Sequence, residues 1–269
     1  ETLGGPLVAK ALDGFVSDDR SANMIRVVPK GAPVSDDART LVDDIRDAPP
    51  GGDLTTYLTG STPDLQDTVD RMYSDFPKIV VYVAVVTYVA LFLLFRSVLL
   101  PLKAVVLNVM SILASFGALV FVFQQGHFQS ILGFTSEGFT EASVPILLFS
   151  IVFGLSMDYE VFLLSRVKEE YEANGNNADA VAIGMERSGR IITSAALVLI
   201  LVSAGFASGD ILIVKALGFG TALAIFIDST IVRALLVPAL MRLFSAANWW
   251  APGFLGGGIK PRAGPAGRS

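Results

Sequence analysis

The chain has 269 residues, of which 52% are hydrophobic and only 17% charged, whereas charged residues make up roughly 25% of ordinary soluble domains. Its net charge of -5, without a basic aromatic face, argues against a nucleic-acid partner. The lack of cysteine excludes disulfides and thiol chemistry, and the single histidine, His127, argues against a histidine metal site or a Ser-His-Asp triad. No Walker motif is present, so we expect neither a metal nor a cofactor.

The polar stretch 1–76 predicts a small α/β domain. A strand is predicted over residues 22–28, a helix after Ser35, and a second strand over residues 54–58. Strand, helix and strand in this order form a βαβ unit. A further helix begins near Ser61 and runs towards the apolar part of the chain.

Long apolar segments dominate the rest of the chain. Each is long enough to cross a hydrocarbon core of about 30 Å at about 1.5 Å per residue. Only helices satisfy their own backbone polar groups in lipid without closing into a barrel. The sequence therefore predicts an α-helical polytopic membrane domain at 77–244, with a flexible tail at 245–269. The five predicted helices cover residues 79–95, 104–123, 143–165, 191–209 and 211–243.

The distribution of basic residues predicts the orientation in the membrane. The short hairpin 96–103, the connector 166–190 and the C-terminal tail carry Lys or Arg, whereas the loops 124–142 and 208–210 carry none. The positive-inside rule then places the C-terminus in the cytoplasm. With five crossings, the N-terminal domain is extracytoplasmic. Within the connector, a short amphipathic helix over residues 178–187 is expected to lie on the membrane surface.

An acid deep in the third predicted helix is the leading candidate for function. A carboxylate at mid-membrane depth costs at least about 2.5–3.5 kcal/mol on insertion scales, so Asp158 needs a reason to be there. Its helical face also carries Ser150, Gly154 and Ser165, a small and polar set that favours packing against other helices or water over lipid. We interpret Asp158 as a group that binds and releases protons, with a structural hydrogen bond as the alternative.

The two residues after Asp158 point in other directions. Tyr159 lies about 100° around the helix from Asp158, and its hydroxyl can donate to an acid on a neighbouring helix or relay a proton through water. Membrane tyrosines are often interfacial anchors, but this one lies too deep for that role. Glu160 is interpreted as structural, pairing with Arg190 or another connector base, with relay support as the alternative.

The fourth and fifth helices contribute supporting candidates. Thr193 and Ser194 can hydrogen-bond the acid pair, with ordinary helix packing as an equal alternative. Gly220 begins an i, i+4 series that ends at Asp228, a second buried acid. An ion pair with a base elsewhere in the bundle is the favoured interpretation of Asp228, and Arg233 follows five residues later.

These residues resemble the MMPL transporters of the RND superfamily. The resemblance is carried by the run Phe153-Gly154-Leu155-Ser156-Met157-Asp158-Tyr159-Glu160 and the residues up to Arg166. It extends to Gly218-Phe219-Gly220, to Ile227 through Arg233, and to Val237-Pro238-Ala239. An outer α/β unit that leads directly into a membrane helix is also similar to that family.

The resemblance implies a specific architecture and activity. Family members have twelve membrane helices in two similar halves, lie in the bacterial plasma membrane, and export lipids or hydrophobic compounds driven by proton entry. The Asp-Tyr motifs of the two halves form the proton relay, so Asp158 and Tyr159 would supply one half of it. With one such motif and five helices, this chain is expected to be a C-terminal half whose partner is the missing N-terminal half. Its other expected partners are protons, an apolar cargo, membrane lipids and, as an open possibility, further copies of itself.

Two other functions stay open from the residues alone. The chain could be a non-transporting membrane lipid sensor or assembly subunit whose buried acids only hold helices together. It could also be a protein-translocation accessory of the same superfamily, whose outer domain binds unfolded polypeptide.

Overall fold

The computed structural model describes residues 8–17, 19, 21–30, 35–48, 55–136, 138, 140–253 and 258–259. The chain divides into two compact units, Glu1–Asp75 and Phe76–Ser269, and the division falls beside the domain boundary expected at residue 76. Leu54 and most of the expected tail lie outside the described residues.

The first unit contains a β-hairpin and a helix. Strands β1 (Val8–Val16) and β2 (Asn23–Pro29) pair antiparallel, and β2 covers the strand predicted over residues 22–28. Helix α1 (Asp36–Asp47) begins where the Ser35 side chain accepts a hydrogen bond from the amide of Ala38, which satisfies one free amide of the first turn. Its buried side chains are Ala38, Leu41 and Val42.

The prediction of a βαβ unit is wrong. The partner of β2 is β1, which precedes it in the sequence, and Thr55–Leu58 is not in a strand. The turn-forming pair Asp13-Gly14 hides β1 in the sequence, because Asp and Gly are typical of turns. The ladder register shifts between Leu12 and Phe15, so an irregularity of the kind a β-bulge produces accommodates this pair within a strand.

The five helices long and apolar enough to cross a membrane are confirmed within the described residues. One of them, α2, begins in the first unit and continues through Pro77 without ending. The short helix α4 (Gln129–Leu132) lies in the loop after the second span. The five spans are α2 (Ser61–Phe95), α3 (Leu99–Leu119) continued by η2 (Val120–Gln124), α5 (Ser143–Asn174), α6 (Asn177–Ala207), and a last span of α7 (Leu212–Ile227), η3 (Asp228–Leu236), α8 (Val237–Phe244) and η4 (Ser245–Trp249).

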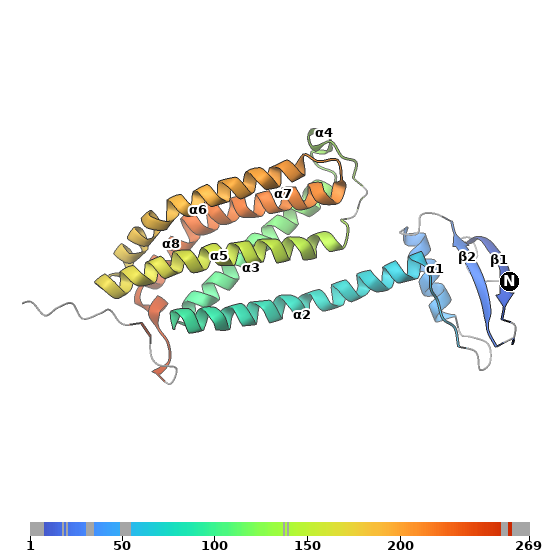
Figure 1. Cartoon of the computed structure of the whole chain (residues 1–269), viewed down its shortest axis with the longest axis horizontal. Coiled ribbons are helices and arrows are strands. Elements are labelled where there is room, and N and C mark those ends of the chain that lie inside the picture. The colour runs from blue at the N-terminus through green and yellow to red at the C-terminus, as the bar shows by residue number, and fades with distance from the viewer. Residues whose placement is uncertain are drawn as a thin grey trace, which may run out of the picture. The chain divides into compact units, whose positions relative to one another are not determined.

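Helices α3, α5, α6 and α7 lie side by side as a bundle (Figure 1). Their buried side chains form one apolar cluster, in which Leu148, Leu163 and Val152 are at most 2% exposed. In a bilayer, such packing and the interhelical hydrogen bonds hold the helices together, since lipid is as apolar as the core.

The connector between α5 and α6 is not a separate surface helix. Both helices continue beyond the apolar segments and meet at a two-residue turn, Gly175-Asn176. Gly175 has a φ of 71° and donates its amide to the Tyr171 carbonyl, a left-handed cap that glycine adopts without strain. The Asn176 side chain then accepts from the amides of Ala178 and Asp179, so the next helix begins at once.

These two helices approach closely at Gly184. A Cβ atom placed there would lie 2.7 Å from Val167 Cγ2 and 3.0 Å from the Val167 backbone. The missing side chain therefore permits the contact between α5 and α6 at this level.

The segment after α8 is packed against the bundle. Asn248 is fully buried and donates to the carbonyls of Met241 and Ser245. Trp249 is also buried, stacks on Tyr171, and donates its indole N–H to Asn177. This part of the predicted 245–269 tail thus has fixed contacts to the ends of α5, α6 and α8.

Candidate functional site

Asp158 lies on a face of α5 that this chain leaves uncovered. Ser150, Gly154 and Asp158 are exposed and Ser165 is half-buried. A Cβ atom built on Gly154 would meet nothing within 4 Å. The small, polar face noted in the sequence is therefore continuous, and none of the other described helices packs over its first three positions.

Tyr159 faces a different way, towards a buried ion pair. The guanidinium carbon of Arg233 lies 5.0 Å from the centroid of the Tyr159 ring. The Nη2 atom of Arg233 donates to Asp228 Oδ2 at 2.7 Å and to the Ser156 carbonyl at 3.1 Å. The side chains of Arg233 and Asp228 are only 4% and 7% exposed. Arg233 thus links the last span to α5 through two contacts, with the Tyr159 ring and the Ser156 carbonyl.

The wide turn of η3 explains why residues five apart can pair. In an α-helix, residues i and i+5 point about 140° apart. Asp228–Leu236 is π-helical, and its hydrogen bonds close five residues along instead of four. Asp228 and Arg233 therefore fall on one face. Asp228 is ion-paired, but its base, Arg233, comes from the same span and not from elsewhere in the bundle as expected.

Glu160 is buried, but not against a connector base. Arg190 is exposed, whereas Glu160 is 6% exposed and lines a small cavity together with Lys103 of α3. The volume is about 10 Å³, close to the minimum for one water molecule. Lys103 also donates to Asn248 Oδ1. The side chains of Glu160 and Lys103 thus line one small cavity.

The other predicted site residues are not gathered around Asp158. Thr193 and Ser194 are exposed on α6, and the Ser194 hydroxyl donates to the Ile191 carbonyl of its own helix. Gly220 is buried, and a Cβ atom there would lie 3.0 Å from Leu148 Cδ2. Gly220 therefore serves close packing of α7 against α5.

Three buried polar residues of α3 were not predicted from the sequence. Asn108, Ser111 and Ser115 are at most 2% exposed. Their spacing of three and four residues puts them on one helix face, and this spacing within an apolar run is the signal that could have revealed them. The Ser111 hydroxyl reaches the Ala224 carbonyl of α7 at 3.5 Å.

The chemistry available to this arrangement is proton binding and charge pairing. It offers an uncovered carboxyl group, a phenol and a buried Arg–Asp pair along two adjacent spans. Within the part of the chain that the structure describes, no three His, Cys, Asp or Glu side chains gather to hold a metal.

Five long apolar helices with a few ionisable groups buried among them define a polytopic membrane protein. The family model of the MMPL family matches residues 3–258, and the chain belongs to that family. The resemblance drawn from residues 153–166 and 218–239 is thereby confirmed.

The chain is similar to mycobacterial proteins along most of its length. It is 40% identical over 253 residues to the "Mycolic acid-containing lipids exporter MmpL11" of Mycolicibacterium smegmatis, covering 93% of this chain and 26% of that protein. It is 39% identical over 252 residues to the "Heme uptake protein MmpL11" of Mycobacterium tuberculosis H37Rv, with 93% and 26% covered. To the "Trehalose monomycolate exporter MmpL3" of the same strain it is 37% identical over 262 residues, with 91% and 27% covered. The chain thus spans about a quarter of the length of these relatives.

Proposed function

We propose that this chain belongs to the C-terminal half of a proton-driven exporter of lipids or other hydrophobic compounds, with Asp158 and Tyr159 as one half of its proton relay. The N-terminal domain would be extracytoplasmic and the C-terminus cytoplasmic. The second half would bring its own Asp-Tyr helix to the centre of the membrane.

The observation that carries the proposal is that two adjacent residues of α5 have different surroundings. Asp158 lies on the uncovered Ser150–Gly154 face, where a facing helix of small side chains could approach closely. Tyr159 lies instead against Arg233, within the bundle. A proton bound by Asp158, at the interface between the two halves, would therefore change the charge of this residue. Its sequence neighbour, Tyr159, contacts Arg233 of the last span.

Protonation has a defined physical consequence in this arrangement. Neutralising Asp158 removes a charge that is expensive to hold within a membrane, so the packing of the two halves can change with its proton occupancy. A membrane potential contributes about 2.3 kcal/mol for each charge per 100 mV. Proton entry can thus supply the free energy for a cycle of helix movement.

The cargo class follows from the relatives. Two of them are named as exporters of mycolic-acid lipids or trehalose monomycolate and one as a haem uptake protein. All three names denote large, amphiphilic or apolar cargo, which favours a hydrophobic substrate over a small polar one.

The test uses the complete transporter reconstituted in lipid vesicles, with cargo flux and internal pH followed together. Asp158→Asn keeps size and shape but cannot ionise, and we expect it to lower both fluxes by at least about 10²-fold, the usual contribution of a positioned proton-transfer group. Asp210→Asn is the matched control, since Asp210 is an exposed acid at the start of the last span. It should transport normally.

The alternatives give different results in the same vesicles. A lipid sensor would bind lipid without moving protons. A translocation accessory would bind unfolded polypeptide at its outer domain. Undiminished, proton-coupled cargo flux in the Asp158→Asn protein would rule out the relay role.

A further inference from the structure

A buried polar seam lies between α3 and the last span. We define it as Asn108 and Ser111 of α3 with Asp228 and Arg233 of η3; all four are at most 5% exposed. None of the four is needed to cover the Asp158 face, and two of them come from a helix that the proposed relay does not use.

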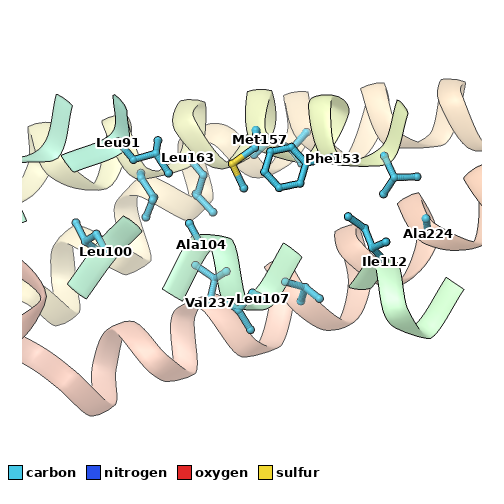
Figure 2. Close-up of a cluster of buried hydrophobic side chains, with 14 of the residues drawn as sticks. Leu91, Leu100, Ala104, Leu107, Ile112, Phe153, Met157, Leu163, Ala224 and Val237 are labelled. Atoms are coloured by element: carbon cyan, nitrogen blue, oxygen red, sulfur yellow. The ribbon is translucent and has the colours of Figure 1, made fainter. Parts of the chain in front are cut away.

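Two contacts between α3 and the last span lie at the two ends of the seam. At one end, Leu107 and Val237 line the same small cavity. At the other, the Ser111 hydroxyl meets the Ala224 carbonyl. Figure 2 shows Leu107 next to Val237 at the first of these ends. Asn108 lies between the two contacts on α3, and Asp228 and Arg233 lie between them on the last span.

The seam contains polar atoms that the protein leaves unpaired. Both side-chain atoms of Asn108, Nδ2 and Oδ1, are buried without a hydrogen-bond partner in the described part of the chain. The same is true of Nε and Nη1 of Arg233. Buried donors and acceptors almost always have a partner, because leaving them unpaired forfeits their hydration. These four atoms are buried inside the chain. A second half of the transporter that packs on the surface therefore cannot supply their hydrogen-bond partners.

We propose that Asn108 and Arg233 hold water molecules inside the seam. Water fits all four atoms, because it can accept from Arg233 and from the Asn108 amide and can donate to the Asn108 carbonyl oxygen. An anion would face the carboxylate of Asp228, and a cation would face the guanidinium of Arg233. A buried water commonly makes about three hydrogen bonds to groups of this kind.

The role of this water in transport rests on the proposed function. Tyr159 contacts Arg233, and Arg233 contacts Asp228, so water at Asn108 extends this polar path from α5 through η3 to α3. A hydrogen-bonded water can take up a proton at one side and release another at its other side, and it ends unchanged. Asn108 does not titrate. It acts as a positioning residue that orients the water.

The test combines a structure of the complete transporter, at a resolution that shows buried waters, with proton flux in vesicles. The unmodified protein should show density within hydrogen-bond distance of both Asn108 and Arg233. Asn108→Leu keeps the branching and the number of side-chain heavy atoms but has no polar atoms. It should lose the density at this position and lower the proton flux about tenfold, equivalent to the net worth of one hydrogen bond, with its thermal unfolding little changed.

Ser115→Ala is the matched control. Ser115 is as buried as Asn108 and lies on the same face of α3, but its hydroxyl donates to the Ser111 carbonyl of its own helix. This variant should keep both the water density and the flux.

The outcomes separate this inference from the proposed function. A dry seam in the unmodified protein, at a resolution where other buried waters are visible, overturns the water site whatever the variants do. Retained flux in Asn108→Leu alongside lost flux in Asp158→Asn overturns only the transport role of the water. Density at Asn108 together with normal flux in Asp158→Asn leaves the water site standing and removes the proposed relay.

Discussion

Arg233 lies against the ring of Tyr159, with 5.0 Å between its guanidinium carbon and the ring centroid. The same guanidinium pairs with Asp228, so Arg233 contacts the Tyr159 ring and the Asp228 carboxylate at the same time. Both neighbours favour the charged form of the guanidinium.

The Arg233–Asp228 pair should behave as a unit in unfolding experiments. Replacing Asp228 alone with Asn leaves a buried charge without its counter-ion and should destabilise the protein by about 3–5 kcal/mol. The double variant Asp228→Asn, Arg233→Gln should recover much of this loss. Chemical unfolding in detergent measures both. Equal destabilisation by the single and double variants would contradict a coupled pair.

An exposed pair provides the control for that measurement. Arg166 and Glu169 lie three residues apart on α5 and pair at 2.8 Å, with side chains 48% and 62% exposed. Neutralising Glu169 should change the free energy of unfolding by about 1 kcal/mol or less.

Gly184→Ala should destabilise the contact between α5 and α6. The added methyl group would lie 3.0 Å from backbone atoms of Val167, which cannot move as a side chain can, and overpacking of this kind costs about 1–3 kcal/mol. Gly189→Ala, on the same helix with nothing within 4 Å of its Cβ position, should instead stabilise by about 0.5–1 kcal/mol. Thermal unfolding of both variants checks the difference in sign.

Trp249→Phe should weaken the anchoring of the segment after α8. The change keeps an aromatic ring beside Tyr171 but removes the 2.9 Å hydrogen bond to Asn177 Oδ1. A buried acceptor left without its donor costs about 1–3 kcal/mol. Protease sensitivity at residues 245–253 measures the loss of anchoring. The neighbouring Trp250 is 59% exposed, and Trp250→Phe should leave the cleavage rate unchanged.

Lys215→Met should loosen the loop that contains α4. Lys215 is buried at the start of α7 and donates to the carbonyls of Leu132 and Gly133. Methionine keeps much of the side-chain length but cannot donate, so hydrogen exchange over residues 126–136 should rise about tenfold, as expected for one lost hydrogen bond. Ile213→Met, at an exposed position of the same helix end, is the control. Equal exchange in the two variants would show that Lys215 does not hold the loop.

The sequence was sufficient to predict the five spans, because long apolar runs have few alternatives to membrane helices. It also predicted β2 and α1, whose apolar spacing and Ser35 cap are local signals. Strand β1 was missed because Asp13-Gly14 interrupts it with a turn signal. Residues 178–187 are helical as predicted, but they form the first part of α6 and not a separate helix, because only a two-residue break, Gly175-Asn176, separates α5 from α6.

The candidate site was predictable only as separate residues. The sequence singled out Asp158, Tyr159 and Asp228, but it could not show that Arg233 pairs with Asp228, since that geometry requires the π-helical turn. Glu160 was assigned a connector base because its depth was visible in the sequence and the position of Lys103 across the bundle was not. Asn108 lacks a charge and was therefore passed over.

The π-helical stretch Asp228–Leu236 has a consequence for motion along the last span. Its wider turns contain more residues than α-helical turns of the same height. If this stretch tightened to α-helix, everything from Val237 to Trp249 would swivel by about 100° for each residue released. The Arg233 guanidinium would turn away from the Asp228 carboxylate, and the Trp249 indole would lose its hydrogen bond to Asn177. A change from π-helix to α-helix in this one stretch would thereby couple the Arg233–Asp228 pair to the position of Trp249.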